Sequence, residues 1–227
     1  MKTKSVLNGF VYFSIIYIII LFFGKEDVAW FLKPFLLLFL IIAVYLQKQF
    51  TTKKILLIAL TLSWIGDIIL MFADHGEIYF IAGLIAFLLS HIFYIILFRK
   101  QVVSILNKNK ITFWLGTSLI ILYLGAMMLI LLPNLGDLKI PIFIYAFTIS
   151  IMLFCALNGF LHWQKPANKY VLIGAIFFVT SDSILAFNKF YCPLPNNSFL
   201  IMSTYLVAQY LITLGILNLN KKDIVVL

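Results

Sequence analysis

Apolar runs of about 20 residues recur along this chain, and short polar segments separate them. A helix of about 20 residues crosses the hydrocarbon core of a bilayer, so runs of this length predict membrane spans. Of the 227 residues 64% are apolar and 11% are charged, whereas about 25% are charged in soluble domains. These patterns exclude a soluble enzyme, a disordered chain and a disulfide-stapled secreted domain. The loops are too short for a soluble domain, so any chemistry lies within the membrane or at its edge.

Polar breaks divide the sequence into eight predicted helices. They indicate an all-α, polytopic transmembrane helix bundle that forms a single transmembrane domain over residues 1–227. We expect the first run to be a retained helix rather than a cleaved signal peptide, because no small-residue cleavage site follows it. The predicted helices cover residues 6–23, 31–46, 55–73, 78–98, 111–132, 139–162, 170–187 and 198–219.

Basic residues are distributed unequally between alternate loops. Eight helices place both termini on one side, and 13 of the 17 Lys and Arg residues fall on that side, whereas three fall on the other. The 13 are Lys2, Lys4, Lys48, Lys53, Lys54, Arg99, Lys100, Lys108, Lys110, Lys165, Lys169, Lys221 and Lys222. Because basic loops stay in the cytoplasm, we predict cytoplasmic termini in a multi-pass protein of a bacterial cytoplasmic membrane. The net charge of +9 then reflects membrane orientation, and no nucleic-acid partner is expected.

Three charged residues lie inside the predicted spans, namely Lys33, Asp67 and Asp182. A charge at membrane depth costs at least ~2.5–3.5 kcal/mol, so each one indicates a functional site. At 1.5 Å per residue, all three lie about 18–20 Å from the inner ends of their helices, which predicts one cavity in the outer half of the membrane. Two alternatives remain open: Lys33 reaches outward to the membrane surface, or it forms a purely structural buried pair with the aspartates.

Polar and small residues form stripes at helical spacing around these charges. Polar groups avoid lipid, so the stripes are expected to converge on the interior of the bundle. We assign substrate binding to Lys33, His91, Tyr94, Tyr145, Ser181, Tyr205 and Gln209. Helix packing is the alternative for Ser63, Ser181 and the glycines, and an interhelical hydrogen bond is the alternative for His91. The three histidines include no pair at ligand spacing, so neither a metal nor another cofactor is predicted.

A short internal repeat supports a division into halves. Residues 66–72 (Gly-Asp-Ile-Ile-Leu-Met-Phe) align with residues 181–187 (Ser-Asp-Ser-Ile-Leu-Ala-Phe), at an offset of 115 residues. The offset equals four predicted helices, and an even number of helices per half favours a parallel four-plus-four pseudo-repeat.

At these positions the sequence resembles the YhhN-like lysoplasmalogenase family of eight-helix membrane proteins. The residues that carry the resemblance occur in order along the chain: Lys33-Pro34, Gly66-Asp67, Gly83, Phe87, His91, Tyr94, Tyr145, Gly174-Ala175, Phe178, Ser181-Asp182, Ala186, Tyr205 and Gln209. The resemblance implies a lysophospholipid substrate whose vinyl-ether bond is hydrolysed. The products are a fatty aldehyde and a glycerophospho-ethanolamine or -choline, and Asp67 and Asp182 form the catalytic pair.

Acid chemistry agrees with that implication. Protonation of a vinyl ether gives an oxocarbenium ion, as in glycoside hydrolysis by two carboxyl groups. Burial and mutual repulsion would keep one aspartate protonated near neutrality, and the other would act as the base. Lys33 would hold the lipid phosphate as a point charge. The sequence does not distinguish the acid from the base, and a small proton-coupled transporter or a non-enzymatic lipid-binding protein would carry the same charges.

Overall fold

The computed structural model describes residues 2–101 and 110–220. These residues are helical along most of their length, and no strand occurs among them, which confirms the all-α fold class. Three basic residues that were counted for orientation, Lys108, Lys221 and Lys222, lie outside the described residues.

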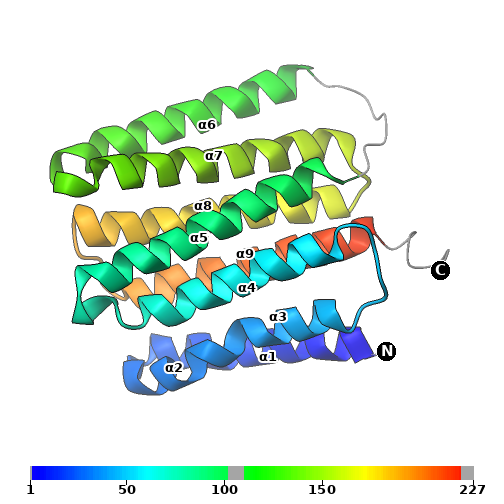
Figure 1. Cartoon of the computed structure of the whole chain (residues 1–227), viewed down its shortest axis with the longest axis horizontal. Coiled ribbons are helices and arrows are strands. Elements are labelled where there is room, and N and C mark those ends of the chain that lie inside the picture. The colour runs from blue at the N-terminus through cyan, green and yellow to red at the C-terminus, as the bar shows by residue number, and fades with distance from the viewer. Residues whose placement is uncertain (1, 102–109, 221–227) are drawn as a thin grey trace. The chain divides into compact units, whose positions relative to one another are not determined.

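Eight spans follow one another along the chain (Figure 1). The second span consists of two helices joined by a 3₁₀ turn, and 3₁₀ turns of the same length occupy two of the connections. The elements are α1 (Lys2–Phe22), α2 (Glu26–Leu32), η1 (Lys33–Phe35), α3 (Leu36–Tyr45), α4 (Lys53–Leu70), η2 (Ala73–His75), α5 (Glu77–Arg99), α6 (Lys110–Leu131), η3 (Leu132–Asn134), η4 (Gly136–Leu138), α7 (Lys139–His162), α8 (Ala167–Phe190) and α9 (Asn197–Leu219).

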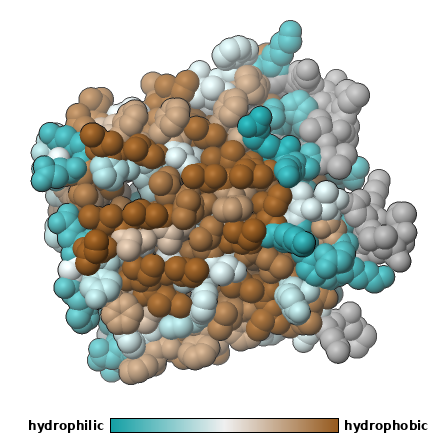
Figure 2. Space-filling view, viewed as in Figure 1, coloured by the Kyte–Doolittle hydropathy of each residue, from teal (hydrophilic) through white to brown (hydrophobic). Residues whose placement is uncertain are grey.

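Within the described ranges, seven of these spans are long and apolar enough to cross a membrane. The eighth, α4, has 18 residues and carries Lys53, Lys54 and Asp67. Figure 2 shows hydrophobic side chains along the middle of the helices and hydrophilic side chains gathered near their ends. Large apolar side chains remain exposed on this middle stretch, among them Leu119 and Leu122 of α6. Such surfaces are unfavourable in water and suit lipid, as expected for a polytopic membrane protein.

The second span begins earlier than the sequence predicts. The sequence predicts a helix over residues 31–46, after a polar break at residues 24–27. The span instead begins at Glu26, and Pro34 lies in its interior within η1. Proline has no N–H to donate, so the helix tightens to a 3₁₀ turn there. The Trp64 indole of α4 donates a 2.7 Å hydrogen bond to the Pro34 carbonyl, so this backbone oxygen has a hydrogen-bond partner from a neighbouring helix.

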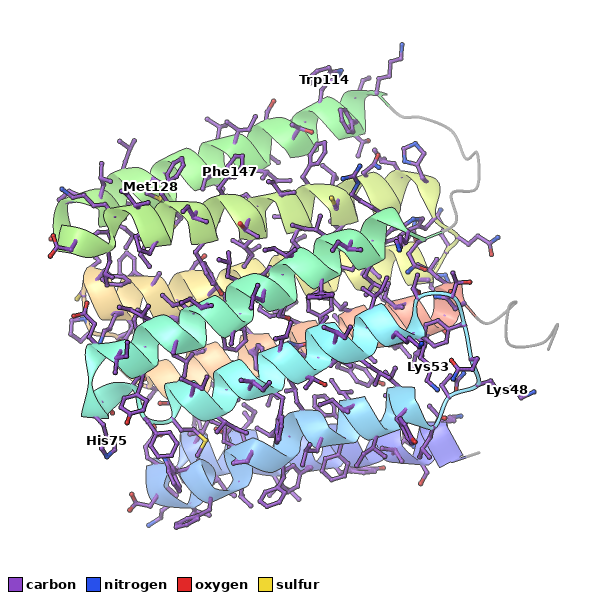
Figure 3. The ribbon with its side chains drawn as sticks, viewed as in Figure 1. Lys48, Lys53, His75, Trp114, Met128 and Phe147 are labelled. Atoms are coloured by element: carbon purple, nitrogen blue, oxygen red, sulfur yellow. The ribbon has the colours of Figure 1, made fainter. Side chains whose placement is uncertain are left out.

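A buried lysine fixes the connection between α3 and α4. Lys53 is 6% exposed, and its ammonium group donates to the carbonyls of Tyr45 (2.8 Å) and Gln47 (2.6 Å). A cation at the carbonyl end of a helix complements the helix dipole. In Figure 3, Lys48 and Lys53 lie at one end of α4 and His75 lies at the other.

The described residues divide into two compact units. Unit 1 contains α1 to α5 as far as Leu97, together with Asn220, and unit 2 contains the described part of Phe98–Leu219. The parallel four-plus-four pseudo-repeat stays a prediction. The single transmembrane domain over residues 1–227 stays a prediction.

Small residues bring neighbouring helices together in both units. In unit 1 a Cβ on Gly66 would lie 2.7 Å from the Phe87 ring of α5. In unit 2 a Cβ on Gly174 would lie 2.9 Å from the backbone nitrogen of Ile212 and 3.0 Å from the carbonyl of Ala208, both on α9. These glycines therefore serve helix packing, which the sequence analysis had left as their alternative role.

Candidate functional site

The predicted site residues fall in both units. Unit 1 contains four of them, and unit 2 contains the other five. The former are Lys33, Asp67, His91 and Tyr94, and the latter are Tyr145, Ser181, Asp182, Tyr205 and Gln209. The predicted pairing of Asp67 with Asp182 joins the two units, so it stays a prediction, as does a cavity shared by both.

Asp67 is buried near the end of α4, with 5% of its surface exposed. It lies 14 residues beyond Lys53 and three residues before Leu70, where the helix ends. The sequence predicted a helix to residue 73, so Asp67 is closer to the end than expected. The 3₁₀ turn at Pro34 places the half-buried Lys33 within electrostatic range of the Asp67 and Glu26 carboxylates. Unit 1 therefore brings together the cation and the acid that the sequence singled out.

Tyr17 of α1 belongs to the same surroundings, although the sequence analysis did not identify it. Its side chain is 2% exposed and lies within electrostatic range of Asp67 and Glu26. Its helix buries a stripe at helical spacing that consists of Phe10, Ser14, Tyr17 and Leu21. The one polar neighbour on that stripe, Ser14, is the signal that would have marked this face of an otherwise apolar helix.

Two predicted residues of α5, His91 and Tyr94, have no exposed surface. They follow Ser90, whose hydroxyl donates to the Ala59 carbonyl at 2.9 Å and accepts from the Ser63 hydroxyl at 2.7 Å. The polar stripes of α4 and α5 therefore face each other. His91 and Tyr94 lie on the buried side of this contact, and their role in binding a substrate stays a prediction.

Asp182 is half-buried on α8, 15 residues beyond Ala167. The Tyr145 hydroxyl, on α7, donates a 2.5 Å hydrogen bond to Asp182 Oδ2. A second tyrosine, Tyr123 of α6, makes a hydrogen bond with the Ser183 hydroxyl. Because Ser183 donates its single proton to the Val179 carbonyl at 2.5 Å, Tyr123 is the donor in that pair. The sequence analysis did not identify Tyr123, since one tyrosine in an apolar run carries no positional signal.

Ser181 of α8 and Tyr205 of α9 serve the contact between these two helices. The Ser181 hydroxyl donates to the Ile201 carbonyl at 3.0 Å, which is the packing role left open for it. The Tyr205 ring meets the Phe178 ring edge-on, with 5.5 Å between centroids. Gln209 has no exposed surface. None of these contacts involves a substrate, so substrate binding by Ser181, Tyr205 and Gln209 stays a prediction.

The chemistry available in each unit is that of a carboxyl group inside a membrane span. A carboxyl group can donate or accept a proton, and low dielectric strengthens its interactions with charges and hydrogen-bond donors. Across residues 2–101 and 110–220, no three His, Cys, Asp or Glu side chains come close enough together to hold a metal ion.

Comparison with known proteins gives one family and several relatives. The family model of the YhhN family matches residues 28–216. Human lysoplasmalogenase TMEM86A is 33% identical over 171 residues, which cover 70% of this chain and 63% of the human protein. Human lysoplasmalogenase TMEM86B is 32% identical over 163 residues, which cover 70% of this chain and 62% of that protein. The chain thus spans a little under two thirds of the length of these relatives. No solved structure matches it.

Proposed function

Because this chain belongs to the YhhN family, we propose that it is an intramembrane hydrolase that cleaves the vinyl-ether bond of lysoplasmalogens. The products are a fatty aldehyde and a glycerophospho-ethanolamine or -choline. The observation that carries the proposal is the similarity to two human proteins named lysoplasmalogenase, over 70% of this chain. The two aspartates inside membrane spans supply the acid–base groups that such a reaction needs.

The proposed reaction proceeds in three steps. A carboxylic acid protonates the alkene carbon remote from the ether oxygen, which leaves an oxocarbenium ion at the adjacent carbon. Water adds to that carbon and loses a proton to a carboxylate, which gives a hemiacetal. The hemiacetal then collapses: its hydroxyl group gives up a proton to a carboxylate and becomes the aldehyde, the carbon–oxygen bond to glycerol breaks, and the glycerol oxygen takes up a proton from a carboxylic acid. One water is consumed for each aldehyde and each glycerol hydroxyl released.

Asp67 and Asp182 are the proposed acid–base pair of this reaction. Lys33 is the proposed contact for the lipid phosphate, and its half-buried position leaves part of it open to a ligand. His91, Tyr94, Tyr205 and Gln209 complete the proposed binding surface, whereas the Ser181 hydroxyl already donates to the Ile201 carbonyl and serves helix packing. This arrangement requires the two units to present their aspartates to one substrate molecule.

The proposal is tested with purified protein in detergent and a 1-alkenyl lysolipid in D₂O. We expect a fatty aldehyde that carries one deuterium at carbon 2, because the added proton comes from exchangeable groups. The saturated 1-alkyl analogue should bind and inhibit without being cleaved, since it has no double bond to protonate. Cleavage of the alkyl ether would contradict the mechanism. The absence of aldehyde would contradict the activity, and lipid-independent proton flux across liposomes would favour a transporter.

The 13-to-3 distribution of basic residues carries a separate proposal about orientation, with both termini cytoplasmic. Reporter fusions after Leu227 and within residues 99–110 should both give a cytoplasmic signal in a bacterial host. A periplasmic signal at either position would overturn this orientation. The enzymatic proposal does not depend on that outcome, because it requires only that the helices lie in the membrane.

A further inference from the structure

The contact between Tyr145 and Asp182 suggests a role for the tyrosine other than the substrate binding that its sequence position indicated. The two side chains come from neighbouring helices of unit 2, α7 and α8, and both are half-buried. The distance from the Tyr145 hydroxyl to Asp182 Oδ2 is 2.5 Å. Hydrogen bonds from a hydroxyl to a carboxylate fall at about 2.5–2.7 Å and are roughly twice as strong as neutral ones.

An aspartate needs such a partner if its carboxyl group is to face a reacting atom. The last torsion of an aspartate side chain, unlike its first, has broad and nearly two-fold preferences, so the carboxyl plane is not fixed by the backbone. A donor at one oxygen fixes that plane. It also occupies one lone pair of Oδ2, so an added proton goes preferentially to the other oxygen.

We propose that Tyr145 is a positioning residue that acts through Asp182. Its hydroxyl holds Oδ2 as an acceptor, so that the proton which Asp182 exchanges with the lipid or with water is carried on Oδ1. The inference rests on the proposed hydrolase function for the identity of the substrate. It applies whether Asp182 is the acid or the base, because each role transfers one proton at one carboxyl oxygen.

A matched control lies on the next helix. Tyr123 also donates its hydroxyl to a side chain of α8, but its acceptor is Ser183, one residue beyond Asp182. Tyr123→Phe and Tyr145→Phe therefore each remove one phenolic hydroxyl that faces α8. The two variants differ in whether the Asp182 carboxylate loses a donor.

The kinetic test measures kcat and KM for aldehyde release. We expect Tyr145→Phe to lower kcat by about 10- to 100-fold with KM within about twofold, since a misdirected catalytic group costs rate rather than binding. Tyr123→Phe should stay within about twofold of the wild type in both constants. In the Asp182→Asn background, Tyr145→Phe should cause no further loss, because residues that act as a unit are not additive. A higher KM at unchanged kcat would instead show substrate binding and overturn the inference.

An infrared measurement tests the same inference without any lipid. The stretching band that disappears in Asp182→Asn, either that of a carboxylate or that of a protonated carboxyl group, identifies Asp182 in the wild-type spectrum. That band should be displaced in Tyr145→Phe and unchanged in Tyr123→Phe, at equal thermal stability of the two variants. An unchanged band in Tyr145→Phe overturns the inference even if the protein is a hydrolase. A displaced band in a protein that releases no aldehyde supports the Tyr145–Asp182 contact and contradicts only the proposed function.

Discussion

The two aspartates occupy equivalent positions in sequence but different surroundings in the structure. Each lies on the third span of its unit, in segments that align at an offset of 115 residues. Asp67 is buried near a cation, Lys33, and near Tyr17. Asp182 is half-buried and accepts a hydrogen bond from a neutral phenol, Tyr145. Similar segments thus have different neighbours: a lysine lies near Asp67, and a tyrosine donates to Asp182.

This difference has a consequence for proton transfer. A carboxylate beside a cation at low dielectric loses a strong attraction when it is protonated. A carboxyl group held by a phenol keeps a hydrogen bond in both protonation states, because the oxygen that accepts from the phenol remains an acceptor. The comparison therefore makes Asp182 the better candidate for repeated proton exchange and Asp67 the better candidate for stabilising positive charge.

The largest expected effect is on aldehyde release. Asp67→Asn and Asp182→Asn should each lower kcat by about 10²–10⁴-fold, the usual contribution of a general acid or base. Asp137→Asn, in the exposed turn η4, is the control and should retain wild-type activity. If either Asp67→Asn or Asp182→Asn keeps the wild-type kcat, the paired-aspartate mechanism is wrong. The two aspartates then differ in their surroundings but not in a catalytic role.

The second-largest expected effect is on the free energy of unfolding, which should change differently when each aspartate is replaced. Asp67→Asn removes one of the two carboxylates near Lys33, the other being Glu26, and should lower the free energy of unfolding by about 1–3 kcal/mol. This is below the cost of breaking a fully buried pair, because Lys33 is half-buried. The double variant Asp67→Asn/Lys33→Met should recover most of that loss. Asp182→Asn should change stability by less than about 0.5 kcal/mol, since the amide oxygen can still accept from Tyr145.

Denaturant unfolding in detergent measures these differences. If Asp67→Asn and Asp182→Asn lower the free energy of unfolding equally, the nearby Lys33 does not distinguish Asp67 from Asp182 in stability. A double variant that is no more stable than Asp67→Asn alone would show that Lys33 reaches the membrane surface and does not interact with Asp67.

A smaller contrast concerns how closely the helices approach in each unit. Gly174→Ala should lower the free energy of unfolding by about 1–3 kcal/mol, because its Cβ would meet backbone atoms of α9, which cannot rotate away. Gly66→Ala should cost less, since the Phe87 side chain that it meets can shift. Gly125→Ala on α6 is the control, because an added Cβ there meets nothing within 4 Å. A larger loss for Gly66→Ala than for Gly174→Ala would reverse this ranking of the two contacts.

The smallest effect concerns the interhelical hydroxyl contacts. Ser63→Ala and Ser181→Ala each remove one hydrogen bond between helices, which is worth about 0.6 kcal/mol on average inside a membrane. Both variants should keep wild-type KM, because these hydroxyl groups already donate to the protein. A raised KM for Ser181→Ala at unchanged stability would restore the substrate-binding role that the sequence predicted for it.

Sequence reasoning located the spans to within a few residues, because hydropathy and helix length depend on composition alone. It placed the start of the second span five residues too late, because Glu26 and Asp27 were taken as part of a polar break and instead form the first turn of α2. Pro34 lies inside this span, where its carbonyl accepts a hydrogen bond from the Trp64 indole of α4, a residue that is 30 positions away in the sequence. Tyr17 and Tyr123 were missed for a related reason, since a tyrosine in an apolar run looks the same whether it faces lipid or a carboxylate.

The sequence by itself determined that this chain is an all-helical, polytopic membrane protein, and that Lys33, Asp67 and Asp182 are the charges inside its predicted helices. These conclusions follow from the cost of charge and the length of apolar runs, which are properties of segments. Only the tertiary structure decided the partners: Lys33 near Asp67, Tyr145 on Asp182 Oδ2, and Ser181 on the Ile201 carbonyl. A hydrogen bond between helices depends on rotation and register, and residues far apart in sequence set both.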